Sequence, residues 1–169
     1  MAAPKAPVSP PVAVEVLPLL DERTGERRRV GRRIHRNGSE TVFVLADKDP
    51  AAFVTEILKA TFRARGFRVA DSGPVDITVQ GRMTHFQVVA RPAVAGTTRL
   101  EAKVALAVTV ANRADRSSLR VRTESSPTRQ TVFFRPEEAS RLLEEAALEA
   151  AELLLRDLRL VGRTLRRAP

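Results

Sequence analysis

Cysteine, tryptophan and tyrosine are absent from the 169 residues of this chain. Without cysteine, the protein has no disulfide, no thiolate ligand for a metal and no cysteine nucleophile. With only 7 phenylalanines as aromatic residues, it has few of the platforms on which proteins stack single-stranded nucleic acid. No apolar stretch approaches the ~20 residues that a membrane-spanning helix needs.

Groups that carry out chemistry are also scarce. Histidine occurs only at His35 and His85, and neither has a partner at the spacing typical of a metal site. Asp47 and Asp49 resemble the start of a calcium loop, but the rest of such a loop is missing, and Asp49 is explained as a helix cap. Serine-elbow and glycine-rich phosphate motifs are absent. We therefore expect no catalytic residues, no metal site and no cofactor, and a protein that is not an enzyme.

The chain is instead rich in arginine. It has 29 Lys and Arg against 20 Asp and Glu, for a net charge of +9, and only four of the 29 are lysines. The densest run is ERRRVGRRIHRNG, from Glu26 to Gly38. This run gives a candidate basic contact surface, made of Arg27, Arg28, Arg29, Arg32, Arg33 and Arg36.

The alternative interpretation is a solvated hairpin in which the flanking acidic residues pair with the arginines. Exposed ion pairs of this kind contribute little free energy and do not indicate a function. These acids are Asp21, Glu22, Glu26 and Glu40. A second basic cluster, Arg156 to Arg167, ends the chain. The contact-surface interpretation gains support if the two clusters meet in space.

Apolar periodicity predicts a single domain over 12–167, preceded by a flexible Pro/Ala-rich linker over 1–11. We expect an α+β fold: a two-layer sandwich with a mainly antiparallel sheet of about four to six strands and two amphipathic helices on one face. The alternating segment 12–20 predicts a first strand, which could be an edge for strand addition. Asn37-Gly38 predicts a hairpin turn between Arg32–Arg36 and Thr41–Ala46.

Local signals place the other elements. Asp49-Pro50 and Gly66 bracket a first helix, whose apolar stripe is Phe53, Ile57, Ala60 and Ala64. In the long strand that follows, apolar parity changes near Thr84–His85, which predicts a bulge. The last strand continues through Arg129–Phe134 after a break at Ser125-Ser126-Pro127. A second helix is predicted from Pro136 to Arg167, with Leu158, Val161 and Leu165 in its stripe.

Three motifs carry a family resemblance. Asp21-Glu22-Arg23 follows the first strand, Ala64-Arg65-Gly66-Phe67 closes the first helix, and Gly73-Pro74-Val75-Asp76 opens a long strand. Together with VGRRI at 30–34, they resemble the YajG family of small bacterial envelope lipoproteins, over residues 12 to 160. The resemblance implies a periplasm-facing domain that a lipidated cysteine, missing from this chain, tethers to a membrane. It implies no catalytic residues.

Two functional hypotheses follow. The first is a non-enzymatic envelope accessory protein that binds another envelope component, either an unidentified protein or an anionic membrane surface. The second is a cytoplasmic nucleic-acid-binding module that uses the arginine run at 27–36, which requires those arginines to converge with the C-terminal cluster. The scarcity of aromatic residues and the interleaved acids count against nucleic acid as the partner. The sequence leaves the partner and the oligomeric state open.

Overall fold

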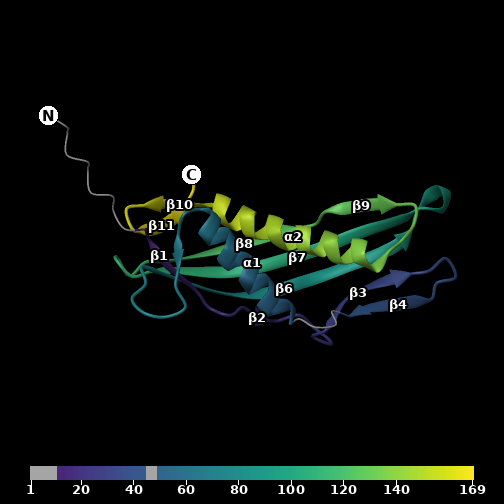
Figure 1. The fold of residues 1–169 in the computed structure, drawn as a ribbon, viewed down its shortest axis with the longest axis horizontal. Helices are drawn as coiled ribbons and strands as arrows, with labels where there is room; N and C mark the ends of the chain where they lie inside the picture. Colours follow the sequence, from purple (N-terminus) through teal and green to yellow (C-terminus); the bar gives the residue numbers. More distant parts are fainter. Residues whose placement is uncertain (1–10, 45–48) are drawn as a thin grey trace.

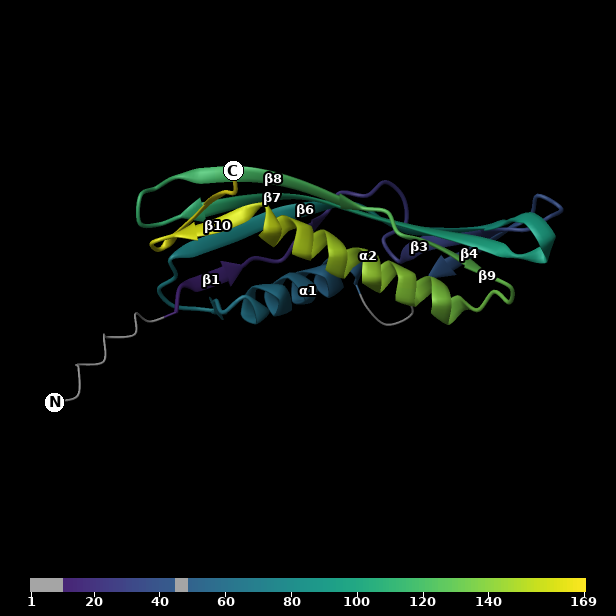
Figure 2. The ribbon, with the colours of Figure 1, turned by 90° about the horizontal axis from the view of Figure 1, so that it is seen from above.

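A computed structural model describes residues 11–44 and 49–169 of the protein (Figure 1). In these ranges nine strands form one sheet, two α helices lie on the same face of it, and two further strands form a hairpin (Figure 2). The expected two-layer α+β fold is confirmed, but the sheet is larger than the four to six strands expected. The predicted linker lies outside the described residues except for Pro11, as do Leu45–Lys48.

The elements in chain order, up to the first long strand, are β1 (Ala13–Val16), β2 (Leu20–Asp21), β3 (Arg29–Ile34), β4 (Glu40–Val44), α1 (Pro50–Ala64), β5 (Arg68–Val69) and β6 (Ile77–Pro92). They are followed by η1 (Val94–Gly96), β7 (Thr98–Asn112), β8 (Ser118–Ser125), β9 (Thr128–Thr131), α2 (Pro136–Arg156), β10 (Leu158–Val161) and β11 (Thr164–Arg167).

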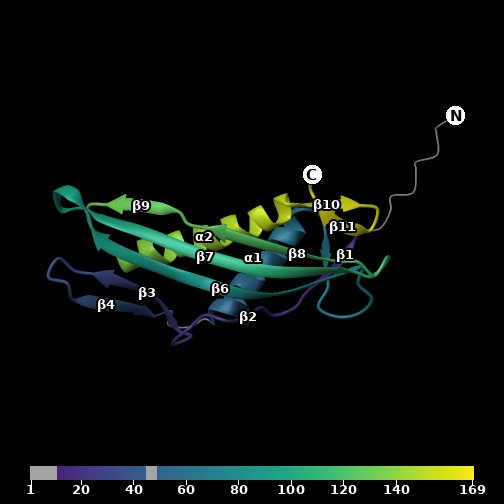
Figure 3. The same cartoon turned by 180° about the vertical axis from the view of Figure 1, so that it is seen from behind.

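The antiparallel pair of β6 and β7 forms the centre of the sheet (Figure 3). Strands β8 and β9 pair in sequence with β7, separated by the predicted break at Ser126-Pro127. The short strands β1, β2 and β3 pair in parallel with successive parts of β6. The parity change in β6 is a bulge, since its register with β7 shifts between Met83 and His85 as predicted.

Strand β1 is not an edge. It pairs in parallel with β5 on one side and with β6 on the other. The expectation that this strand offers an edge for strand addition is therefore wrong. Strand β4 pairs with β3 in an antiparallel hairpin, and the turn contains Gly38 at a φ of +82°, as Asn37-Gly38 predicts.

Both helices bury one side against the sheet. The Asp49 carboxylate accepts the Ala52 N–H at 3.0 Å and caps α1, and Gly66 has the positive φ of +86° that its C-terminal position requires. The buried side of α1 runs through Val54, Leu58 and Phe62. The predicted apolar stripe, which began at Phe53 and Ile57, therefore lies to one side of the face that is actually buried. Helix α2 packs on β6, β7 and β8 through Leu142, Leu143, Ala146, Ala147, Ala150, Leu154 and Leu155.

The C-terminal helix is shorter than predicted. Helix α2 ends at Arg156, and the last residues form the antiparallel hairpin of β10 and β11. Gly162 turns this hairpin at a φ of +62°, a conformation that glycine adopts without strain. Leu158 and Leu165 are buried as expected of core residues, but Val161 is exposed. Leucines in this segment fit both a helical and a strand period, so their spacing alone does not decide between a helix and a hairpin.

Asp76 connects this hairpin to the beginning of the sheet. Its carboxylate accepts two hydrogen bonds from the Arg163 guanidinium, at 2.9 and 2.6 Å. It also accepts the buried N–H of Ala13 at 2.8 Å. The hydrogen bonds from Arg163 hold the pKa of Asp76 below its ordinary value, with a smaller contribution from Ala13. The acidic residue of the Gly-Pro-Val-Asp motif is therefore a structural group.

We predict that Asp76→Ala lowers the free energy of unfolding by about 1–3 kcal/mol at pH 7, because the Ala13 N–H loses its acceptor. Since folding lowers the pKa of Asp76, its stabilisation is complete above the unfolded-state pKa of about 3.9 and is lost as the pH falls below it. In urea unfolding, the difference between wild type and variant should therefore narrow in acid, where protonation of Asp76 removes its charge interaction with Arg163. Asp71→Ala, which removes an exposed partner of Lys59, is the control and should change stability by less than ~0.5 kcal/mol. A pH-independent difference would contradict this account.

Candidate functional site

The Asp21-x-Arg23 motif organises the loop that contains the first arginines. Asp21 and Arg23 form a two-contact ion pair, at 2.9 and 2.7 Å, and their side chains are only 5% and 11% exposed. The same guanidinium donates to the backbone carbonyls of Arg27, Arg29 and Phe86. The hydrogen bond from Arg23 holds the pKa of Asp21 below its ordinary value. Arg23 therefore ties the loop to β6 and is not available for a partner.

The six candidate arginines do not form one patch. Arg27, Arg28 and Arg29 are exposed around the Arg23 loop. Arg32 pairs with Glu40 at 3.1 Å, as the hairpin interpretation predicts. Arg33 lies over the Phe134 ring, 4.5 Å from its centroid. A guanidinium nitrogen of Arg36 lies near Gly96, in the turn between β6 and β7.

The two basic clusters do not meet in space. The C-terminal hairpin β10–β11 lies at one end of the long axis, and the β3–β4 hairpin lies at the other (Figure 1). In the C-terminal cluster, Arg163 pairs with Asp76 and Arg166 pairs with Asp115. The convergence that the nucleic-acid hypothesis requires is therefore absent from the described part of the chain.

A different surface forms at the β3–β4 end. The segments 32–38, 91–99 and 129–135 meet there, at the tips of the β3–β4 and β6–β7 hairpins and the connection from β9 to α2 (Figure 1). We call it the distal surface. These segments hold seven arginines and no acidic residue. The arginines are Arg32, Arg33, Arg36, Arg91, Arg99, Arg129 and Arg135.

Contacts between the three segments hold the distal surface together. The Gln130 amide donates to the Thr97 hydroxyl at 2.7 Å, and Thr98 pairs with Thr131 across β7 and β9. Phe134 stacks on Phe43 of β4, with ring centroids 5.5 Å apart. These contacts come from residues far apart in the sequence, so the surface exists only in the folded protein.

Large apolar side chains are exposed on the distal surface. Val94 is 80% exposed, Val132 65% and Phe133 77%. Strand β9 ends at Thr131, so the prediction of a strand through Phe134 is wrong for its last three residues. Phe134 packs against the core, whereas Phe133 points away from it. Burying such side chains is favourable, so their exposure makes the distal surface a candidate contact surface.

Sequence reasoning found Arg32, Arg33 and Arg36 but missed the rest of this surface. The run TVFF looks like the end of a buried strand, and the loop RPAVAGTTR looks like an ordinary hairpin connection. One available signal was that all three segments are free of acidic residues in a chain with 20 of them. Which segments lie together depends on the sheet order.

The histidines have polar neighbours within the protein. The His35 ring bonds the Thr41 hydroxyl at 2.8 Å, and the His85 ring lies 3.4 Å from the hydroxyl of Thr84 at the bulge. Among residues 11–44 and 49–169, no group of three or more His, Asp or Glu side chains is arranged to hold a metal ion. Asp47, the other residue of the calcium-like sequence, lies outside these ranges.

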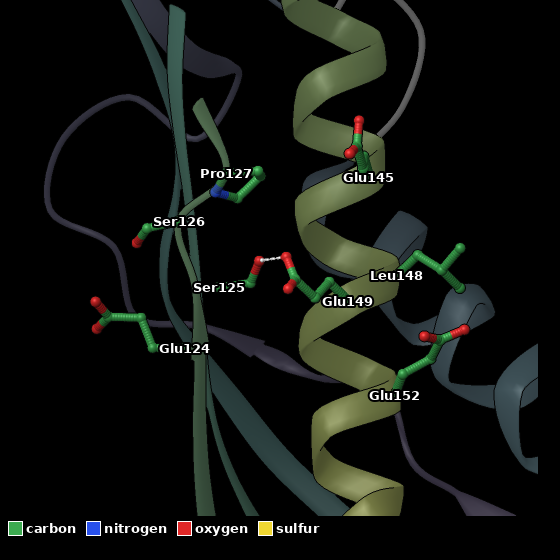
Figure 4. Close-up of a pocket in the computed structure, with 8 residues that line it drawn as sticks. All are labelled: Glu124, Ser125, Ser126, Pro127, Glu145, Leu148, Glu149 and Glu152. Atoms are coloured by element: carbon green, nitrogen blue, oxygen red, sulfur yellow. Dashed lines mark hydrogen bonds between the residues drawn. The ribbon is translucent and has the colours of Figure 1, made fainter. Parts of the chain in front are cut away.

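An acidic hollow lies between β8 and α2 (Figure 4). Ser125 donates to the Glu149 carboxylate at 2.5 Å, and these two side chains point toward each other. Glu124 and Ser126 point away from the helix. Glu124 pairs with Lys103, and Glu145 pairs with Arg129. The carboxylates therefore do not converge on one point, as acid–base chemistry would require.

Comparisons with known proteins support the fold. No family model matches the sequence, and neither does any curated protein sequence. Protein XCC0632 from Xanthomonas campestris, described as a member of family DUF330, superposes with a TM-score of 0.59 at 14% identity, over 85% of this chain and 82% of that one. The hypothetical protein CT253 from Chlamydia trachomatis superposes with a TM-score of 0.50 at 9% identity, over 87% and 92%.

A minor lipoprotein from Acinetobacter baumannii is also similar, with a TM-score of 0.45 at 11% identity, over 65% of this chain and 85% of that one. At these identities the likeness shows the fold alone. None of these three structures is described as a YajG protein, so that specific resemblance stays a prediction.

We predict that replacing Arg23 lowers the stability of the protein far more than replacing the exposed arginines at 27–29. Arg23→Ala should lower the free energy of unfolding by about 3–5 kcal/mol, because it leaves the buried Asp21 carboxylate without its cation. Replacing Arg27, Arg28 and Arg29 together with serine should change stability by less than ~0.5 kcal/mol, as at other exposed sites. Thermal unfolding of both variants measures the difference. Equal losses would show that the exposed arginines also support the fold.

Proposed function

We propose that this protein is a non-enzymatic accessory domain of the bacterial cell envelope, tethered to a membrane and facing the periplasm, which binds another envelope component through its distal surface. The observation that carries the proposal is the group of exposed apolar side chains among arginines at one end of the molecule. The tether and the compartment rest on the resemblance of the Asp21-x-Arg23, Ala-Arg-Gly-Phe and Gly-Pro-Val-Asp motifs to envelope lipoproteins.

Several features favour a binding role over catalysis. The carboxylates of the acidic hollow do not converge on one point, and the two histidines bond to threonines. Asp21 and Asp76, whose pKa values are shifted, are held by arginines within the fold and face no open cleft together.

Neither α1 nor α2, the helices of the described residues, combines the length and apolar character of a membrane-crossing segment.

We predict that the protein isolated from its native cells carries an acylated cysteine ahead of this sequence and is recovered with the membranes. Intact-mass measurement of the membrane and soluble fractions tests this directly. An unmodified chain that begins at Met1 in the soluble cytoplasm would overturn the envelope assignment. Nucleic-acid binding with a steep dependence on salt would then be measured next.

We also predict that a photocrosslinking amino acid at position 133 gives a discrete adduct in those cells. The matched control is position 161 at the opposite end, where Val161 is 49% exposed. An adduct from position 133 alone supports a specific contact at the distal surface. Equal labelling from both positions, or none from either, would contradict it.

A further inference from the structure

We propose that the distal surface docks on a bilayer that contains anionic phospholipids, with Val94, Val132 and Phe133 inserted among the headgroups. In this orientation Arg36, Arg91 and Arg99 bind lipid phosphates. This inference rests on the proposed function, because it names the component that the distal surface contacts. Its three supports are the shape of the surface, its charge and its rigid presentation of apolar side chains.

The shape favours a bilayer over a protein. The tips of the β6–β7 hairpin and of the β9–α2 connection stand at the end of an elongated molecule, beyond the ends of both helices (Figure 2). Exposed apolar side chains on projecting loops enter a fluid interface directly, whereas a protein partner needs a cavity of matching shape. An apolar group surrounded by basic residues is the composition typical of interfacial membrane binding.

The charge favours phosphate. Arg91 and Arg99 face each other across β6 and β7, an arrangement of like charges that destabilises a sheet. A guanidinium nitrogen of Arg36 reaches the same turn, 3.9 Å from where a Cβ on Gly96 would lie. Three cations thus gather where the three segments supply no acidic residue. Phosphate oxygens relieve this repulsion and match the geometry of the guanidinium group.

The turn between β6 and β7 holds the side chain of Val94 exposed to solvent. Ala93 N–H donates to Thr97 O at 2.8 Å, and both the N–H and the hydroxyl of Thr97 donate to Val94 O. Ala95 has a φ of +55°, a left-handed conformation that costs a non-glycine residue free energy. On the adjoining loop, the Thr131 hydroxyl donates to Phe133 O at 2.9 Å. The apolar side chains are therefore presented by ordered backbone, which lowers the entropic cost of docking.

The placement of β1 gives the docked orientation. Strand β1, which follows the proposed tether, lies at the opposite end of the long axis from the distal surface (Figure 1). A lipid anchor before Pro11 and a docked distal surface would hold the long axis along the membrane. Two attachments to one bilayer strengthen each other through their high effective concentration.

The test uses co-sedimentation of the full chain with vesicles of phosphatidylcholine, with or without about one-third phosphatidylglycerol. Wild-type protein should sediment with the anionic vesicles and not with the neutral ones. The double variant Val132→Ser/Phe133→Ser should bind the anionic vesicles about tenfold more weakly, or worse, because it removes inserted apolar area. The matched control is Leu160→Ser/Val161→Ser, which removes two exposed apolar side chains, 45% and 49% exposed, at the opposite end. The control should bind like the wild type.

A second variant separates binding from stability. Arg99→Glu replaces a repulsive cross-strand pair with an attractive one, so its Tm should rise by about 1–2 °C. Its affinity for the anionic vesicles should fall about fivefold or more. A purely structural role for Arg99 does not predict a more stable protein that binds less well.

Failure of wild-type protein to bind the anionic vesicles would overturn the inference, as would equal losses in the distal and control double variants. Binding that salt abolishes but that Val132→Ser/Phe133→Ser leaves unchanged would show charge attraction without insertion, and would also overturn it. If vesicle binding fails while position 133 still crosslinks to a protein in cells, the proposed function stands and only the membrane as partner is excluded.

Discussion

The pairing of β6 with β7 is the constraint on which the rest of the fold depends. Strand β6 has 16 residues, so it spans ~53 Å at 3.3 Å per residue, whereas the 21 residues of α2 span only ~32 Å. One helix cannot cover such a hairpin. Helix α1 extends the cover toward β1, and the turn of the hairpin projects beyond both helices (Figure 2). The distal surface is this uncovered end, so its exposure follows from the length of the hairpin.

The arginines of the chain serve two different purposes, which composition alone does not separate. Arg23 and Arg163 each bind an aspartate through two contacts. Through Phe86 O and Asp76, respectively, they join segments distant in sequence. Arg36, Arg91 and Arg99 instead gather around one turn without an acidic residue in their segments. A high content of arginine therefore argues for an anionic partner only where the fold concentrates these side chains beyond the reach of its own carboxylates.

The sequence predicted correctly those features of the fold that neighbouring residues determine. The Asp49 cap, the Asn37-Gly38 turn and the bulge near His85 depend on residues within a few positions of one another. The parallel pairing of β1 and the end of α2 depend on tertiary contacts instead, since Leu158 and Leu165 fit either a helix or a hairpin. The distal surface was largely missed for the same reason. Val132 and Phe133 look like core residues until the sheet shows that β9 ends before them.

The motifs in which this chain resembles envelope lipoproteins mainly maintain the fold. Asp21 holds Arg23, Gly66 ends α1, and Asp76 holds Arg163 to the first strand. Because these interactions are internal, similarity in them says little about what a protein binds. The distal surface is built from hairpin tips and a connection, which tolerate changes that the core does not. Proteins that share this sheet can therefore differ in partner, and in our proposal the arginines and apolar side chains of the distal surface set the specificity of this chain.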